Sequence, residues 1–229
     1  RDLHSFPTRR SSDLENYKVI SKGLWSNNCV KKLYIMKKRL GSSSLYKPNK
    51  DAYTLYDLKK KNYPSFEVSN EIDIECTTIK ESLNNLNIKK LDFLKIDTQG
   101  AEIEILKGLG NYLPLLLKIE VQIVPMYENI PDWSELINHL YKLNYMTCEW
   151  EEIGNHATHS PVEMDMLFIP NYLNHAGKEL IMSRKKKFIS LMLIFGQIKL
   201  LQIISTKLNF SETLEIERSE EHTSELQSQ

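Results

Sequence analysis

Leu-Asp-Phe-Leu-Lys-Ile-Asp-Thr-Gln-Gly-Ala-Glu-Ile-Glu-Ile-Leu-Lys-Gly, residues 91–108, is the stretch that decides the fold. Its first part is rich in apolar residues, has the length of a strand and ends at Ile96, and turn-forming residues follow. From Ile103 onward the apolar period changes, because Leu106 and Leu109 recur at helical spacing. The stretch therefore predicts a buried strand, a tight turn and a helix.

Asp97 directly follows the predicted strand, at its carboxyl end. In open α/β sheets, ligands bind in the crevice beyond the carboxyl ends of the strands. The next residues, 98–101, open the predicted helix, and their N–H groups are expected to be free to bind a ligand. We therefore expect Asp97 to lie at the functional site.

The same stretch resembles the signature of the FkbM-like methyltransferases, which use S-adenosylmethionine. Lys-Ile-Asp-Thr-Gln-Gly-Ala-Glu at 95–102 and Ile-Leu-Lys-Gly at 105–108 carry the resemblance. It extends over about 17–169, with Ser-Ser-Ser-Leu at 42–45 and Glu-Met-Asp-Met-Leu-Phe at 163–168 as flanking matches. The resemblance implies an α/β fold with a Rossmann-like methyltransferase sheet, mostly parallel and closed by an antiparallel hairpin.

The resemblance also implies methyl transfer from S-adenosylmethionine to a hydroxyl group of a sugar, polyketide or lipid-linked acceptor. Asp97 is then expected to orient or deprotonate the acceptor, Glu102 to hold the turn or contact substrate, and Glu120 to be the second acidic candidate. The remaining expected contacts are Ser43, Ser44, Gln99 and His156 with substrate, and Gly23, Leu24 and Trp25 with the adenine side of the cofactor.

Two features of the family are missing from residues 15–217. The Gly-rich first loop, which accommodates the methionine part of the cofactor, has no counterpart, and neither has the acidic residue that contacts the ribose. In addition, Ile79 and Lys80 stand where the family usually has Leu-Asp. We expect the missing strands to lie upstream, so the chain as it stands is expected to be an inactive fragment.

Both ends of the chain match translations of common sequencing adapters. Agreement at both ends is not expected by chance, so we exclude residues 1–14 and 218–229 from fold reasoning. The rest is expected to comprise a partial methyltransferase domain at 15–170 and a C-terminal helical extension at 171–217.

The charge balance and the cysteines indicate which partners and which cellular compartment to expect. The 30 basic and 30 acidic residues balance, whereas a nucleic-acid groove normally shows a strongly basic domain or stripe. Cys29, Cys76 and Cys148 are an odd number, widely separated and without a Cys-x-x-Cys pair. They predict unpaired thiols in a reducing compartment, not a disulfide framework or a zinc site. We therefore expect a cytoplasmic protein that does not bind nucleic acid.

A second, almost wholly apolar strand is predicted at 115–121, and such runs are typical of parallel sheet interiors. If this strand lies beside the first, Glu120 comes near Asp97 at the same sheet edge. Two such carboxylates can share a divalent cation, divide acid and base roles, or form ion pairs with Lys95 or Lys118. The residues alone leave these alternatives open.

The other elements follow from shorter patterns. The Gly-Ser-Ser-Ser loop at 41–44 can line a site or satisfy a turn, and His156 and His159 form only a weak metal pattern. Alternation in 72–79 predicts a strand with Ile72, Ile74 and Cys76 inward. Further strands are predicted at 17–24, at 30–36 pairing back against it, at 145–150 and at 164–169, with helices at 81–86 and from Pro131.

The C-terminal extension differs in kind from the rest. A basic cluster at 184–187 precedes an apolar run at 188–204 that is too short and too often interrupted for a spanning helix. The run can be a helix that packs on the domain or a partner, or an interfacial helix on anionic lipid. Peripheral membrane contact through 184–204 is therefore expected as one alternative. It supports a second hypothesis, a non-catalytic α/β binding module. The oligomeric state stays open.

Overall fold

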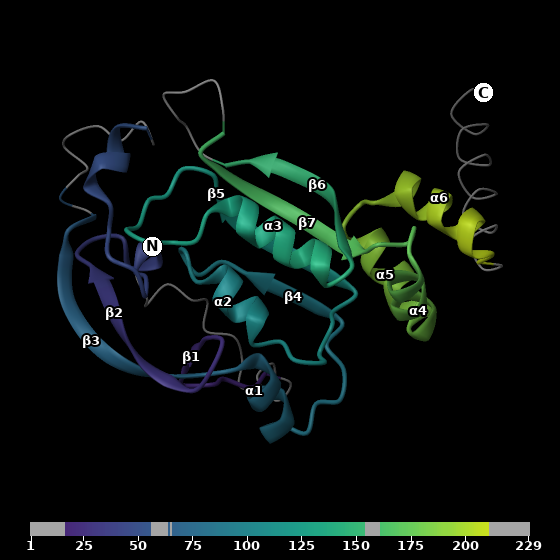
Figure 1. The fold of residues 1–229 in the computed structure, drawn as a ribbon, viewed down its shortest axis with the longest axis horizontal. Helices are drawn as coiled ribbons and strands as arrows, with labels where there is room; N and C mark the ends of the chain where they lie inside the picture. Colours follow the sequence, from purple (N-terminus) through teal and green to yellow (C-terminus); the bar gives the residue numbers. More distant parts are fainter. Residues whose placement is uncertain (1–16, 56–63, 65, 154–160, 211–229) are drawn as a thin grey trace, which may run out of the picture.

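The computed structural model describes residues 17–55, 64, 66–153 and 161–210. These residues form a mixed α/β fold with two sheets (Figure 1). The α/β class predicted from the sequence is confirmed.

The larger sheet has the strand order β4-β5-β7-β6. Its strands are β4 (Phe93–Ile96), β5 (Leu116–Gln122), β7 (Glu163–Pro170) and β6 (Tyr145–Glu152). β4 and β5 are parallel, and β7 is antiparallel to both β5 and β6. Three strands therefore run in one direction, and the predicted closing antiparallel hairpin, β6 and β7, is confirmed.

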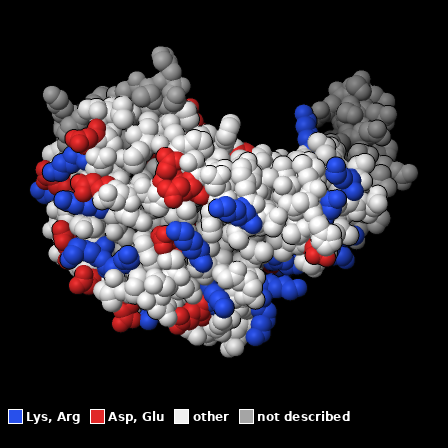
Figure 2. All heavy atoms as spheres, viewed as in Figure 1, with Lys and Arg blue, Asp and Glu red and all other residues white. Residues whose placement is uncertain are grey.

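The smaller sheet has the order β1-β3-β2 and was not predicted as a separate unit. It comprises β1 (Gly23–Leu24), β2 (Cys29–Met36) and β3 (Val68–Thr77). The prediction that 30–36 pairs back against 17–24 is wrong, because β3 lies between β1 and β2 and only two residues of that first run form a strand. Over β2 and β3, charges of both signs are interspersed (Figure 2).

Short helices connect β2 to β3 and β3 to the larger sheet. They are η3 (Leu40–Ser42), η4 (Lys50–Thr54) and α1 (Ile79–Asn85). The prediction that Ile72, Ile74 and Cys76 of β3 point inward is confirmed only at one end of the strand. Cys76 is buried, whereas Ile72 is 39% exposed. The middle of β3 is therefore exposed, whereas Met36 at the end of β2 and Val68 at the start of β3 belong to a separate hydrophobic core.

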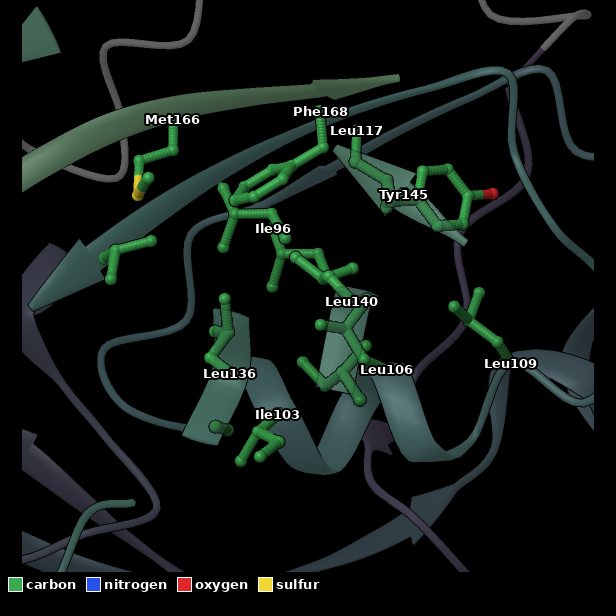
Figure 3. Close-up of a cluster of buried hydrophobic side chains, with 14 of the residues drawn as sticks. Ile96, Ile103, Leu106, Leu109, Leu117, Leu136, Leu140, Tyr145, Met166 and Phe168 are labelled. Atoms are coloured by element: carbon green, nitrogen blue, oxygen red, sulfur yellow. The ribbon is translucent and has the colours of Figure 1, made fainter. Parts of the chain in front are cut away.

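The main core lies between the larger sheet and two helices, α2 (Glu102–Lys107) and α3 (Trp133–Lys142). Leu106 of α2 and Leu136 and Leu140 of α3 point toward the sheet, as the helical spacing predicts, and Ile103 of α2 belongs to the same core (Figure 3). The strands contribute Ile96, Leu117, Ile119, Met166 and Phe168. This packing fixes the carboxyl ends of β4 and β5 relative to the first turn of α2.

Three C-terminal helices pack against the other face of the sheet. They are α4 (His175–Ser183), α5 (Lys185–Ile194) and α6 (Ile198–Leu208). Phe188, Met192 and Ile204 join Leu116 and Ile169 in a second core. The apolar run at 188–204 thus packs on the domain, although as two helices instead of one. None of the helices in the described part of the chain has the length and apolar character needed to cross a bilayer.

Candidate functional site

The turn after β4 has an unusual backbone, which fixes the direction of its side chains. Gln99 has φ 59° and Gly100 has φ 110°, so two consecutive residues are in the left-handed region. A Cβ on Gly100 would lie 2.6 Å from Ile130 Cγ2, so both the conformation and the space require glycine. The turn places Asp97 at the end of β4, with its side chain exposed, and directs Gln99 toward β5.

Glu102 holds this turn together from the first turn of α2. Its buried Oε1 accepts hydrogen bonds from Thr98 N (3.2 Å), Thr98 Oγ1 (3.0 Å) and Gly100 N (3.0 Å). Burial raises the pKa of Glu102, and these hydrogen bonds oppose the rise. The expectation of free N–H groups at 98–101 is therefore wrong for Thr98 and Gly100, because the protein supplies its own carboxylate. Of the two roles expected for Glu102, the structure shows the holding of the turn.

Glu120 lies beside Asp97, as the parallel pairing predicts. The register pairs Ile96 with Ile119, so the next residue of each strand is a carboxylate. Gln99 Nε2 donates to Glu120 Oε1 at 2.8 Å and to Asp97 Oδ1 at 3.5 Å, and so bridges the two. Burial and, secondarily, the charge of Asp97 raise the pKa of Glu120 to about 7. This carboxyl is therefore poised to exchange a proton near neutral pH.

The two lysines expected to neutralise these carboxylates behave differently. Lys95 Nζ is 2.9 Å from Asp97 Oδ2, so the predicted ion pair forms there. Lys118 instead pairs with Asp165 on β7, at 2.8 Å, and not with Glu120. Asp97 is thus partly neutralised, whereas Glu120 is held by the amide of Gln99.

Two carboxylates of β7 were missed by the sequence reasoning. Asp165 is the strand partner of Glu120, and Glu163 is the partner of Gln122. Burial and the charge of Glu120 raise the pKa of Glu163 to about 7. Both residues lie in the Glu-Met-Asp-Met run that carries the resemblance, but the sequence does not show that β7 pairs with β5. Among the described residues, no group of three or more His, Cys, Asp or Glu is placed to bind a metal ion.

The serine loop packs directly on the turn after β4. Ser44 Oγ donates to Gln99 O at 2.6 Å, and Ser43 Oγ accepts from Met36 N at 3.1 Å. Both hydroxyl groups expected to contact substrate therefore bind the protein's own backbone.

Tyr127, which the sequence did not single out, adds a further contact to this loop. Its hydroxyl lies 2.7 Å from Ser42 O and 2.9 Å from Gln99 Oε1, the two acceptors available to its proton. Tyr127 is only 1% exposed, so this hydroxyl helps to fix the orientation of the Gln99 amide inside the protein.

The structure does not bring the expected cofactor residues to Asp97. Gly23 and Leu24 form β1, and Trp25 is buried, with its backbone N–H donating to Thr77 O at 2.8 Å. A Cβ on Gly108 would lie 2.5 Å from Trp25 O, so this segment contacts the opposite end of α2. His156, the last residue expected to bind substrate, lies outside the described residues.

A small cavity adjoins the turn between α2, β5 and the start of α3. It holds about 20 Å³ and is lined in part by Gly100, Glu102, Gln122 and Trp133. That volume suits one water molecule. Asp97 and Glu120 are not among its lining residues.

Comparisons with known proteins bear on this geometry. A family model described as the Methyltransferase FkbM domain matches residues 25–147, which is more than half of the chain. The match includes the turn after β4 and the whole of β5. No curated protein and no solved structure matches the chain.

Proposed function

Because the chain belongs to the FkbM methyltransferase family, we propose that its carboxylate site serves methyl transfer from S-adenosylmethionine to an acceptor hydroxyl. The acceptor class that the resemblance implies is a sugar, a polyketide or a lipid-linked acceptor. The observation that carries the proposal is the pair formed by Asp97 and Glu120, bridged by Gln99 at the carboxyl ends of two parallel strands.

The pair divides into two chemical roles. Alkylation of a hydroxyl requires a base that removes its proton, and a base works best when its pKa lies near the working pH. Glu120, with a pKa of about 7, fits that role better than the sequence-based choice of Asp97. Asp97, paired with Lys95, then orients the hydroxyl by accepting a hydrogen bond.

The described residues supply groups for the acceptor side of this chemistry. Trp25 is buried, with its backbone oxygen beside Gly108 and its ring against Tyr46, and the cavity beside Gly100 is too small for S-adenosylmethionine. We therefore derive no step through the cofactor.

The position of β4 supports the hypothesis that strands encoded upstream complete the sheet. Among the described residues β4 pairs with β5 alone, so its other edge has no strand partner. Ile96 is nonetheless 2% exposed and Phe93 and Leu94 are half-buried, which is typical of an interior strand and not of an edge. An additional parallel strand beside β4 would place a Gly-rich loop next to Asp97.

The test compares two proteins, the present chain and the chain extended by the reading frame upstream of residue 15. Isothermal titration with S-adenosylmethionine is expected to show binding for the extended protein and little or none for the present chain. If the extended protein did not bind it, the proposal that S-adenosylmethionine is the cofactor would be rejected.

Turnover is then measured as transfer of a labelled methyl group to a panel of hydroxyl acceptors. Asp97→Asn and Glu120→Gln in the extended protein are expected to lower turnover at least tenfold, with cofactor affinity largely unchanged. The exposed Glu128, changed to Gln, serves as the matched control. Turnover equal to the control in both variants would remove the catalytic role of the pair.

A second candidate is a binding module without catalytic activity. The occupied N–H groups of the turn favour it, because Glu102 already accepts their hydrogen bonds. Cofactor binding without turnover on any acceptor, in the extended protein, would support this candidate instead.

A further inference from the structure

The C-terminal helices carry a strong positive charge although the chain as a whole is neutral. Between residues 175 and 208 there are seven cationic side chains and one carboxylate, that of Glu179. The cationic residues are Lys178, Arg184, Lys185, Lys186, Lys187, Lys199 and Lys207. Basic side chains predominate over this end of the molecule, at the right of the view (Figure 2). Such an imbalance attracts an anionic partner.

The outward face of the same helices is partly apolar. Phe188 and Met192 of α5 and Ile204 of α6 are fully buried against the sheet. On the outside, Ile194 is 75% exposed and Ile203 is 57% exposed. These two isoleucines are among the most exposed large apolar side chains of the described chain, and they lie on the helices that hold the positive charge.

Helical geometry places lysines and apolar residues in one stripe of α5. Residues seven apart lie on the same face of a helix, so Lys186 precedes Leu193 and Lys187 precedes Ile194 along the outward side. On α6, Lys199 and Lys207 flank Ile203 on the exposed side. This arrangement is typical of helices that lie at a membrane interface, where apolar side chains insert and the long lysine stems reach the headgroups.

An open cavity of about 480 Å³ lies where α4 and α5 meet the start of β4. Five cationic side chains and one carboxylate, Asp92, line it, together with Ser183. Arg184 and Lys187 pair with Asp92 at 3.2 and 2.8 Å. The other lining cations are Lys90, Lys185 and Lys186. The cavity therefore has a surplus of positive charge and the size for a phosphate-containing headgroup.

We propose that α5 and α6 dock the protein on an anionic lipid surface. Lys90, Lys186 and Lys199 contact the headgroups, and Leu193, Ile194 and Ile203 enter the boundary between headgroups and acyl chains. The surplus of positive charge selects an anionic membrane over a neutral one. This proposal is independent of methyl transfer, because none of these residues belongs to the carboxylate site.

Sedimentation with vesicles tests the proposal on the full chain. Vesicles of phosphatidylcholine with phosphatidylserine are expected to bind the protein, and vesicles of phosphatidylcholine alone much less. A double variant, Lys186→Gln with Lys199→Gln, is expected to weaken partitioning about 25-fold, because each lysine near an anionic surface contributes roughly a factor of five. Ile194→Gln with Ile203→Gln is expected to weaken it at least tenfold.

Matched controls come from the opposite end of the molecule. Lys38 and Lys50 are exposed, and changing both to Gln removes the same charge. Val30 on β2 is 63% exposed, and Val30→Gln removes a similar apolar side chain. These controls are expected to leave partitioning within a factor of two of the unchanged protein, with thermal unfolding confirming that every variant is folded.

Three results would overturn the proposal. One is partitioning that does not depend on phosphatidylserine, and another is a loss of partitioning in the controls as large as in the test variants. The third is concentration-dependent self-association without vesicles that disappears with Ile194→Gln and Ile203→Gln, since it would assign the surface to a second copy of the chain.

Discussion

Glu102 shows how a single buried side chain determines the geometry of the candidate site. One carboxylate oxygen receives three hydrogen bonds from the turn that separates β4 from α2. Two of the donors are backbone N–H groups, which would be left without a partner if the side chain were removed. A buried N–H without a partner costs more than the hydrogen bond itself contributes.

We therefore expect Glu102→Ala to lower the free energy of unfolding by about 3 kcal/mol. Glu102→Gln keeps an oxygen acceptor and the side-chain shape, so it is expected to cost about 1 kcal/mol. Urea denaturation measures both changes, with Glu128→Ala on the exposed surface as the control. Equal losses for the Ala and Gln variants would show that the hydrogen bonds to Thr98 and Gly100 do not stabilise the turn.

Glu120 makes the stability of the protein depend on pH. Its pKa is raised from 4.5 to about 7, first by burial and then by the charge of Asp97. A carboxyl with a raised pKa binds its proton more tightly in the folded chain than in the unfolded chain. Its stabilising contribution is therefore complete below about pH 4.5 and is lost as the pH rises through about 7.

Glu120→Gln removes this titration, since the amide stays neutral at every pH. The variant is expected to match the unchanged protein near about pH 4 and to exceed its stability near about pH 8, by up to about 3 kcal/mol. Urea unfolding at a series of pH values measures the difference, and Glu128→Gln is expected to follow the unchanged protein. A Glu120→Gln curve that runs parallel to the unchanged protein would contradict the raised pKa.

At the scale of elements, the sequence predicted those strands and helices whose residue pattern lies within one short stretch of the chain. The run from β4 through α2 was predicted because Ile96 ends an apolar strand and Ile103 begins a helical period. The sequence also predicted that Asp97 and Glu120 lie close together, because each is near the carboxyl end of an apolar strand and the two strands were expected to be adjacent. The bridge by Gln99 could not be predicted, because it depends on positive φ angles that residue types alone do not specify.

The failures concern features that only tertiary pairing decides. β1 is two residues long and exists because Gly23 and Leu24 meet the end of β3, a contact far away in the sequence. The role of Asp165 required knowing that β7 lies against β5. The apolar run at 188–204 was predicted as one helix, but Gly196, with φ 69°, separates α5 from α6. A left-handed glycine ends a helix without interrupting the apolar composition.

The close approach of α4 to the preceding turn gives a prediction at this scale. A Cβ on Gly177 would lie 2.1 Å from Asn171 O, so the helix backbone rests directly on that turn. Gly177→Ala is expected to destabilise the protein by about 2 kcal/mol, although alanine favours helix formation by about 1 kcal/mol. Gly41 has no neighbouring atom within 4 Å, so Gly41→Ala is the control and is expected to be neutral. Thermal unfolding measures both, and an equal response of the two variants would exclude the steric explanation.

At the scale of the whole molecule, one side chain joins the C-terminal helices to the rest. Arg184 lies at the junction of α4 and α5, and its side chain is 8% exposed. Its guanidinium donates to Leu91 O and Leu113 O, both at 2.6 Å, and to Asp92 at 3.2 Å. These acceptors lie just before β4 and β5, so Arg184 holds both strand starts against the helices. The proposed membrane surface and the carboxylate site are thus connected through the same two strands.

Arg184→Met removes these hydrogen bonds while keeping most of the side-chain volume. The variant is expected to lose about 3 kcal/mol of stability, because two partly buried carbonyl groups lose their donor and Asp92 keeps Lys187 alone. Arg184→Lys keeps the charge but cannot reach all the acceptors, so an intermediate loss is expected. Hydrogen exchange is expected to accelerate first in the amides of α4, α5 and α6, while those of α2 and α3 stay protected.

Acid has a related effect on this junction. Burial alone would raise the pKa of Asp92, but the contacts with Lys187 and Arg184 outweigh it and lower the pKa below 3.8. The stabilisation by Asp92 is therefore complete above about pH 3.8. It is lost as the pH falls through the lower pKa that Asp92 has in the folded protein. Arg184→Met moves that loss toward higher pH, so α4, α5 and α6 should release at a less acidic pH than in the unchanged protein. Release of these helices at the same pH in both proteins would show that Arg184 does not hold the junction.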